Sequence, residues 1–118
     1  MKRRQVLIAD DLPQTRDGLR ALLATFPEIK VVAEAADGRE AVQLVEALQP
    51  DVVLMDVHMP GMDGLDATQI IKTSWPETKV IVMTIHAGYQ TEALAAGADA
   101  FFIKGSSTEE LLKAIKSL

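Results

Sequence analysis

Short apolar runs alternate along this chain with longer stretches in which apolar residues recur every three or four positions. Continuous runs of this length are typical of buried strands, whereas the wider spacing is typical of one face of a helix. The runs predict strands at residues 5–9, 29–35, 51–56, 79–83 and 100–103. The spaced positions between and after them predict five helices.

The predicted helices are recognised by apolar positions that share one face. These positions are Leu19, Leu22, Leu23 and Phe26; Ala41, Leu44, Val45 and Leu48; Leu65, Ile70 and Ile71; and Leu111, Leu112, Ile115 and Leu118 in a last helix at 109–118. The fourth helix is expected only at 89–96, since Gly88 disfavours helix and Gly97 can cap the end. Apart from Leu94 its packing residues are mostly alanines, so we expect this helix to be weakly held.

The alternation of strands and helices predicts a single α/β domain, with a parallel sheet that helices cover on both faces. Residues 52–55 have the sequence Val-Val-Leu-Met, without a polar position. Strands of this kind are buried on both sides.

Composition and charge limit the class of protein. A chain of 118 residues, 48% of them hydrophobic and none of them cysteine, is long enough for one domain with one core. No apolar run approaches the roughly 18 residues of a membrane span, and the apolar stretch after the basic start is too short for a signal peptide. We therefore expect a soluble, cytoplasmic protein. The net charge of −5 argues against nucleic-acid binding by this chain, because such binding depends on basic side chains.

Polar side chains follow the carboxyl ends of four predicted strands. Asp10 and Asp11 follow the first strand, and Asp56 ends the third. Thr84 follows the fourth strand and Lys104 follows the fifth. Taken singly, each has an ordinary role: the aspartates in capping or turns, the threonine in a strand, the lysine in solvent. Ligands of such sheets bind at the carboxyl ends of the strands, so the convergence of all five residues indicates a functional site.

Three carboxylates in one place need protons or a cation. Two carboxylates about 4 Å apart repel by about 4 kcal/mol at an effective dielectric constant near 20. A site of oxygen atoms suits Mg²⁺ or Mn²⁺, and an ion held by few carboxylates keeps positions for phosphate oxygens. Lys104 adds a positive charge, and the Thr84 hydroxyl can bind a phosphoryl oxygen. Asp56 is the candidate nucleophile that accepts a phosphoryl group, because its central strand places it between the paired acids and Lys104.

Over essentially the whole chain, these residues resemble the receiver domain of two-component response regulators. The matching segments are VLIADD at 6–11, PDVVLMD at 50–56, MPGMDG at 59–64, VMT at 82–84 and GADAFFIK at 97–104. The segments RDGLRALL at 16–23 and EAADGREA at 34–41 are similar to the NarL/LuxR-like group, whose receivers precede a helix-turn-helix DNA-binding domain.

The resemblance implies a fold and a set of site residues. The fold is a flavodoxin-like, doubly wound α/β domain with a five-stranded parallel sheet in the order 2-1-3-4-5. Asp56 would take the phosphoryl group, and Mg²⁺ or Mn²⁺ would be held by Asp10, Asp11, Asp56 and the backbone carbonyl of His58. Thr84 and Lys104 would bind the phosphoryl group. Phe101 falls where the family has its switch aromatic, although an ordinary place in the core is equally compatible with it.

The resemblance also implies partners and limits. A sensor histidine kinase would supply the phosphoryl group, and a homodimer could form on phosphorylation. The chain would be a regulatory domain rather than an enzyme, since it would catalyse only its own phosphorylation and dephosphorylation. We expect one receiver domain at residues 1–118, with no output domain in this chain. DNA would be bound only through a separate helix-turn-helix domain, and no membrane is involved.

Three features depart from the family's pattern. Lys104 is followed by Gly105, where many receivers have a proline with a cis bond. A cis bond before a residue other than proline costs about 2.5–4 kcal/mol, so we expect a trans bond. His58 and His86 flank the site, and we expect them to tune the lifetime of the phosphate rather than to bind Mg²⁺. The segment 84–104 is also shorter than usual, before the fourth helix.

Three alternative functions are open to a chain of this kind. A phosphatase of the haloacid dehalogenase type would need a second aspartate two positions after its nucleophile, and position 12 is Leu12. A flavodoxin-like FMN binder would need a phosphate-binding loop rich in Gly, Ser and Thr after the first strand, where this chain has two aspartates. A degenerate receiver that serves only as an interaction module would have lost an acid or the lysine, and all are present.

Overall fold

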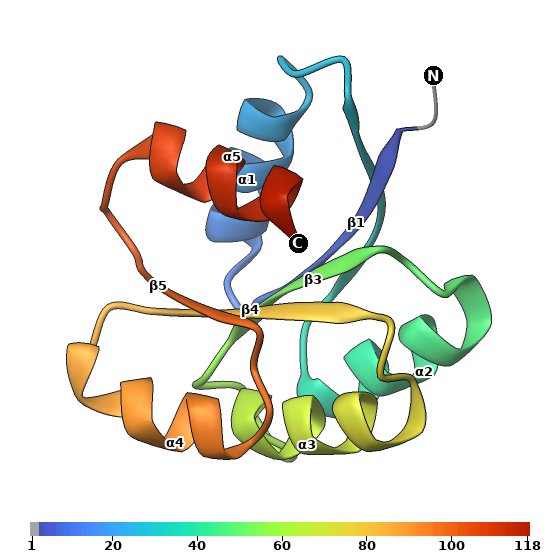
Figure 1. Cartoon of the computed structure of the whole chain (residues 1–118), viewed down its shortest axis with the longest axis vertical. Coiled ribbons are helices and arrows are strands. Elements are labelled where there is room, and N and C mark those ends of the chain that lie inside the picture. The colour runs from blue at the N-terminus through green and yellow to red at the C-terminus, as the bar shows by residue number, and fades with distance from the viewer. Residues whose placement is uncertain (1–2) are drawn as a thin grey trace.

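Strands and helices alternate along the computed structural model, which describes residues 3–118 (Figure 1). Residues 1 and 2 of the basic start lie outside the described part of the chain. The strands are β1 (Arg4–Ala9), β2 (Ile29–Ala35), β3 (Val52–Asp56), β4 (Lys79–Thr84) and β5 (Ala100–Ile103). The helices are α1 (Pro13–Leu23), α2 (Gly38–Leu48), α3 (Gly64–Ser74), α4 (Gln90–Ala95) and α5 (Thr108–Ser117), and a 3₁₀ turn, η1 (Ala87–Tyr89), precedes α4.

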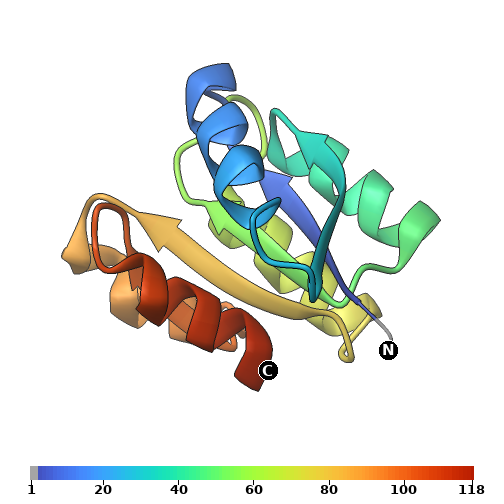
Figure 2. The ribbon, with the colours of Figure 1, turned by 90° about the horizontal axis from the view of Figure 1, so that it is seen from above.

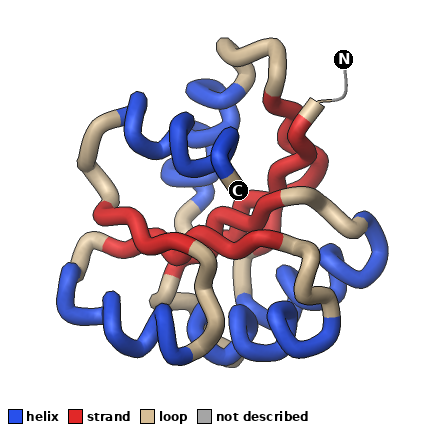
Figure 3. Tube along the Cα trace, in the orientation of Figure 1, coloured by secondary structure: helices blue, strands red, loops and turns tan. Residues whose placement is uncertain are grey.

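The strands form one parallel sheet in the order β2-β1-β3-β4-β5. Helices α1 and α5 cover one face of the sheet, and α2, α3 and α4 cover the other (Figures 1 and 3). Figure 2 shows the twisted strands between these two helical layers. The arrangement confirms the predicted flavodoxin-like, doubly wound fold and its strand order.

Successive residues of the central strands pack into two separate cores. One core lies towards α1 and α5 and includes Val6, Ile8, Val52, Leu54, Leu23 and Leu111. The other lies towards α2, α3 and α4 and includes Leu7, Ala9, Val53, Met55, Val45 and Ile71. Because both faces of β1 and β3 are covered over residues 6–9 and 52–55, every side chain in these two runs is apolar and buried.

Side-chain caps fix where several helices begin. The Asp37 carboxylate accepts the Glu40 N–H at 2.8 Å and so caps α2, and Asp63 accepts the Asp66 N–H at 2.9 Å at the start of α3. The Ser107 hydroxyl accepts the Glu109 N–H at 3.2 Å at the start of α5. Each of these contacts satisfies a backbone donor that has no partner within its own helix. Helix α4 follows η1 without a side-chain cap.

Three large apolar side chains that the periodicity assigned to packed helix faces are exposed instead. Leu48 is 42% exposed, Ile70 38% and Leu94 54%. The fully buried apolar side chains of these helices are those of Ala41, Val45, Ala67, Ile71 and Ala93. Each helix therefore touches the sheet along a narrow stripe that often consists of alanine, and larger side chains beside that stripe reach solvent.

The fourth helix is short, as the sequence predicted, but one residue shorter at each end than the predicted 89–96. Regular helix begins at Gln90 and ends at Ala95, and Gly97 follows with a φ of +100°. A positive φ after the end of a helix is the conformation that favours glycine there. Leu94, however, was expected to pack and instead points to solvent, so Ala93 is the buried residue of α4. Among the described residues, no helix is long and apolar enough to cross a membrane.

Candidate functional site

The carboxyl ends of β1, β3, β4 and β5 meet at one edge of the sheet and border a cleft of about 290 Å³. The residues that line it are Asp11, Leu12, Thr15, Asp56, His58, Thr84, Ile85 and Lys104. The structure therefore brings together the polar residues that the sequence predicted at the strand ends. Asp10 lies just behind this lining, where its carboxylate contacts Lys104.

Three carboxylates form the acidic part of the site. Asp10, Asp11 and Asp56 each offer an oxygen atom, and these atoms all lie within 4.8 Å of one another. Asp10 is 2% exposed and Asp56 is 8% exposed, while Asp11 is open to solvent. Carboxylates buried this closely repel one another unless a positive charge lies among them. A group of oxygen ligands with one side open to solvent is what a hard divalent cation such as Mg²⁺ requires.

Lys104 provides positive charge inside the acidic group. Its Nζ lies 2.6 Å from Asp10 Oδ2 and 3.4 Å from Asp56 Oδ2. Burial lowers the pKa of Lys104, but the hydrogen bond to Asp10 and the attraction of Asp56 outweigh it, so the pKa is raised and the ammonium form is stabilised. Burial raises the pKa of Asp56; the Lys104 charge opposes this, and the Asp10 charge adds to it.

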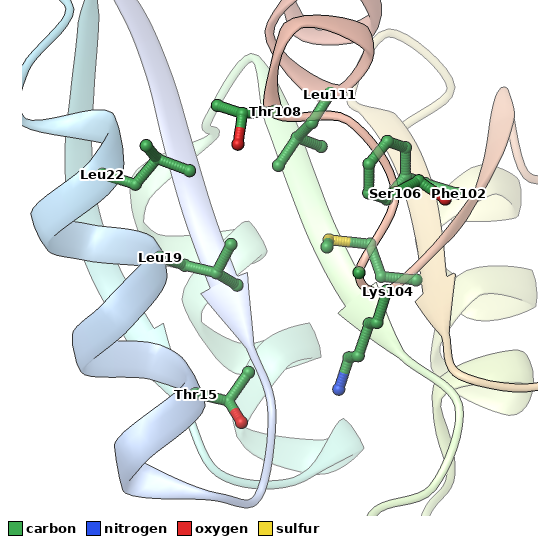
Figure 4. Close-up of a pocket in the computed structure, with 10 residues that line it drawn as sticks. Thr15, Leu19, Leu22, Phe102, Lys104, Ser106, Thr108 and Leu111 are labelled. Carbon is green, nitrogen blue, oxygen red and sulfur yellow. The ribbon is translucent and has the colours of Figure 1, made fainter.

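The aliphatic part of Lys104 borders a second cavity, of about 280 Å³, between α1 and α5 (Figure 4). Leu19 and Leu22 of α1, Phe102 of β5 and Leu111 of α5 line its apolar part. Thr15 and Lys104 line both this cavity and the acidic cleft. A displacement of the Lys104 side chain would therefore change the packing between α1 and α5 as well as the contacts with the carboxylates.

Thr84 is buried at the end of β4, and its hydroxyl oxygen accepts the backbone N–H of His86 at 3.2 Å. A threonine hydroxyl can accept one hydrogen bond and still donate its own proton to a second group. The backbone N–H of Lys104 donates to the Thr84 carbonyl at 2.8 Å. The two residues predicted to bind a phosphoryl group are thus joined through their backbone.

Two glycines hold the loop after Asp56 against the sheet. The Gly64 N–H donates to Val57 O at 2.9 Å, and the Gly38 N–H donates to Met62 O at 3.1 Å. A Cβ atom on Gly64 would lie 1.8 Å from the Asp56 carbonyl oxygen, so no other residue fits without moving the backbone. The sequence signalled both places as Asp-Gly pairs, which indicate turns. It did not reveal that the glycine of each pair is needed for close packing, Gly64 against the Asp56 carbonyl and Gly38 against the Met62 carbonyl.

His58 and His86 belong to a cluster of rings at the rim of the cleft. The His58 ring lies 5.0 Å from the Tyr89 ring and 6.0 Å from the His86 ring, all in edge-to-face arrangements. His86 and Tyr89 are 6.3 Å apart. Edge-to-face contacts of this kind stabilise ring pairs by about 0.5–1.5 kcal/mol. The contact of His58 with Tyr89 and His86 was not predicted, since His58 is distant from them in sequence and only the fold brings it to the segment that holds both.

Phe101 does not line the cleft. It lies on β5 opposite Val82 of β4, is partly buried, and packs against the core that α2, α3 and α4 cover. The peptide bond between Lys104 and Gly105 is trans, as expected, since the described residues contain no cis bond, and Gly105 has a φ of +88°. A positive φ of this size suits glycine, so the loop after Lys104 depends on that residue.

The sheet order and this cleft define the chain as a flavodoxin-like α/β domain with an acidic site at the strand ends, and comparisons identify its relatives. The profile of the response regulator receiver domain matches residues 6–116. The transcriptional regulatory protein DegU of Brevibacillus brevis is 40% identical over 114 residues, which cover 95% of this chain and 48% of DegU. A LuxR-family two-component response regulator from Aurantimonas sp. SI85-9A1 has a crystal structure with a TM-score of 0.92 and 35% identity, covering 98% of this chain and 84% of that chain.

A chain from the CheX–CheY–BeF3–Mg+2 complex of Borrelia burgdorferi is also similar, with a TM-score of 0.86, 27% identity, and coverage of 96% of this chain and 87% of that chain. This chain belongs to the family of response regulator receiver domains, and LuxR-family regulators are among its relatives. It spans about half the length of the curated relatives it matches, for example 48% of DegU.

Proposed function

We propose that this chain is a phosphoacceptor signalling domain in which Asp56 takes a phosphoryl group from a sensor histidine kinase in a reaction that requires Mg²⁺ or Mn²⁺. One observation carries the proposal. Three carboxylates lie within 4.8 Å of one another, and the ammonium group of Lys104 lies among them. Carboxylates this close repel one another, and groups of charges of this kind are typical of functional sites. A bound cation would remove the repulsion and would attract an anionic group.

The donor set fits a hard divalent cation. Asp10, Asp11 and Asp56, together with the backbone carbonyl of His58, would hold it, because carboxylate and carbonyl oxygens are the ligands such ions prefer. When bound, the ion supplies positive charge that neutralises the oxygens of the transferred group. The relative from the CheX–CheY–BeF3–Mg+2 complex supports this assignment, since Mg²⁺ is a named component of that complex.

The residues of this chain have separate tasks in the transfer. A carboxylate oxygen of Asp56 attacks the phosphorus atom and forms the new O–P bond. The bond between phosphorus and the donor breaks, and its electron pair leaves with the donor, which is an imidazole nitrogen of the kinase or an oxygen of a small acyl phosphate. Lys104 pairs with the transferred group, and the Thr84 hydroxyl donates a hydrogen bond to it.

The consequence of phosphorylation is a change of conformation rather than a released product, so the domain regulates and is not an enzyme in the ordinary sense. We assign residues 1–118 to one receiver domain that acts in the cytoplasm and controls a helix-turn-helix output domain. LuxR-family relatives support this output. Phe101 is the candidate switch aromatic, and the phosphorylated form is the candidate homodimer. His58 and His86 at the rim are assigned to the lifetime of the phosphate.

Intact mass spectrometry tests the acceptor. The chain is incubated with acetyl phosphate, once with Mg²⁺ and once with EDTA, beside an Asp56→Asn variant. We expect the wild type to gain one phosphoryl group only with Mg²⁺, and the variant to gain none, because the amide cannot form an acyl phosphate. Equal labelling of Asp56→Asn would disprove the acceptor, and an unlabelled wild type would favour a degenerate receiver that acts only as an interaction module.

A further inference from the structure

Asp10 is held by four hydrogen bonds, two to its backbone and two to its carboxylate. Its N–H donates to Ala35 O at 2.9 Å, and its side chain accepts the Leu12 N–H at 2.9 Å and Lys104 Nζ at 2.6 Å. Its backbone carbonyl accepts a hydrogen bond from Arg16 Nη1 at 2.6 Å. Arg16 is thus the side chain that fixes the backbone at the end of β1, where the first acidic residue stands.

Arg16 is itself held in place by β2. Its Nε donates to Glu34 Oε1 at 3.2 Å, while the other carboxylate oxygen of Glu34 lies 2.9 Å from Arg20 Nη1. The side chains of Arg16 and Glu34 are only 18% and 22% exposed. The planar guanidinium therefore uses one nitrogen for the Asp10 carbonyl and another for Glu34, so it joins α1, β1 and β2 beside the cleft. A lysine could not make both contacts with the same geometry, because its donors lie on a single atom.

Both residues lie in the two segments of similarity to the NarL/LuxR-like group, at 16–23 and 34–41. Nothing in the phosphoacceptor chemistry uses these segments. The fold brings them together at Arg16 and Glu34, which lie next to the carboxylates rather than on the opposite end of the sheet.

On the basis of the proposed metal site, we propose that Arg16, oriented by Glu34, is a positioning residue that sets the Asp10 carboxylate for a divalent cation. Arg16 touches neither the cation nor the phosphoryl group. It acts through the backbone of Asp10, in the way that partners behind a metal ligand fix the orientation of that ligand.

The sign of one substitution separates this role from a simple effect of charge. Arg16→Gln removes a positive charge near the carboxylates, and on Coulomb attraction alone the variant would bind a cation more tightly. If Arg16 positions Asp10, the variant must bind the cation more weakly, since the carboxylate is no longer held in place. Arg20→Gln is the matched control. It removes the same charge and one contact of Glu34 from the same helix, but Arg20 has no hydrogen bond to Asp10.

Calorimetric titration with Mg²⁺ alone, together with thermal unfolding of each variant, tests the proposal. We expect Arg16→Gln to weaken Mg²⁺ binding about ten-fold and Arg20→Gln to change it by no more than about two-fold, since exposed charges are screened. Arg16→Lys keeps the charge and should bind Mg²⁺ with intermediate affinity, because one contact can form but not both.

Unchanged or tighter binding by Arg16→Gln would overturn the proposal, as would equal weakening in Arg16→Gln and Arg20→Gln. Arg16→Lys with wild-type affinity beside a weak Arg16→Gln would show that one contact to the Asp10 carbonyl is enough, and would overturn the role assigned to Glu34. If Arg16→Gln does not fold, Arg16→Lys and Glu34→Gln decide: weaker binding by both supports the proposal, and wild-type affinity in both contradicts it. A wild type without affinity for Mg²⁺ would instead remove the metal site of the proposed function, and this inference with it.

Discussion

The two sides of the acidic cleft are built in different ways. On the side of β1 and β3, backbone segments touch directly, and Gly64 leaves no room for a Cβ atom beside Asp56. Helix α3, which follows β3, is capped by Asp63, whereas α1, which follows β1, has no side-chain cap. On the side of β4, the chain leaves Thr84 through Ile85, which is 67% exposed, and reaches an uncapped helix of six residues in which only Ala93 is buried.

This difference separates the chemical part of the site from the part that can respond. The proposed acceptor, Asp56, lies on a frame that cannot shift without breaking packed backbone contacts beside Gly64. The segment next to Thr84 is held by few buried side chains, and elements of this kind are where local opening and switching motions occur. We infer that a phosphoryl group that pulls on the Thr84 hydroxyl would move the β4–α4 segment rather than the acceptor.

The largest effect is expected from adding an atom to the tightly packed side of the cleft. Gly64→Ala should destabilise the domain by roughly 2–3 kcal/mol, because the added Cβ meets backbone that cannot rotate away. Chemical denaturation in urea measures the effect. Gly18→Ala is the control, since a Cβ atom at this exposed position of α1 meets nothing within 4 Å. It should stabilise the domain by up to about 1 kcal/mol. Similar unfolding free energies for the two variants would contradict the tight packing beside Asp56.

Hydrogen exchange measures how weakly the segment after β4 is held. Amides from His86 to Ala96 should exchange at least roughly ten-fold faster than those of α2, which corresponds to about 1.4 kcal/mol of opening free energy. Helix α2 is the right reference because it is capped by Asp37 and buries Ala41 and Val45. Beryllofluoride at Asp56 should change the protection of the 86–96 segment more than that of α2. Protection equal to that of α2, without a response, would direct the search for the moving surface to α5.

The residue pattern was sufficient for the strands and the residues at their ends, and the family resemblance supplied the strand order. Periodicity identifies strands well when both faces are buried, and the chemistry of the strand ends depends on residue type alone. It could not find which helical side chains pack, because Leu94 and Ala93 differ by one position and the docking of α4 decides which faces the sheet. Contacts between distant segments were likewise hidden. The fork from Arg16 to Asp10 and Glu34 and the rings of His58, His86 and Tyr89 depend on tertiary geometry.

The smallest predicted effect is the dependence of stability on the ionisation of Asp56. Burial and the Asp10 charge raise the pKa of Asp56 above its ordinary value of 3.8, although Lys104 opposes them. A carboxyl group whose pKa is higher in the folded state stabilises the fold most when it is protonated, below its ordinary pKa. That contribution is lost as the pH rises through the raised pKa. Without metal, the wild type should therefore lose stability as the pH rises from the ordinary pKa of Asp56 through the raised one. Asp56→Asn should not, because its amide does not ionise.

Thermal unfolding in EDTA, at several values of pH from about 4 to 8, would measure this difference. We expect the free energy of unfolding of Asp56→Asn to be about 0.5–1 kcal/mol higher than that of the wild type at neutral pH. This difference should disappear as the pH falls towards the ordinary carboxyl pKa. Glu46→Gln is the control, since it removes a carboxylate from an exposed position of α2 and should show no such dependence. The difference in stability at neutral pH requires that the backbone around Asp56 is too rigid to let the carboxylates move apart. An Asp56→Asn variant with the same profile as the wild type would mean that the acidic side relaxes as readily as the β4–α4 segment, and the contrast between the two sides of the cleft would be lost.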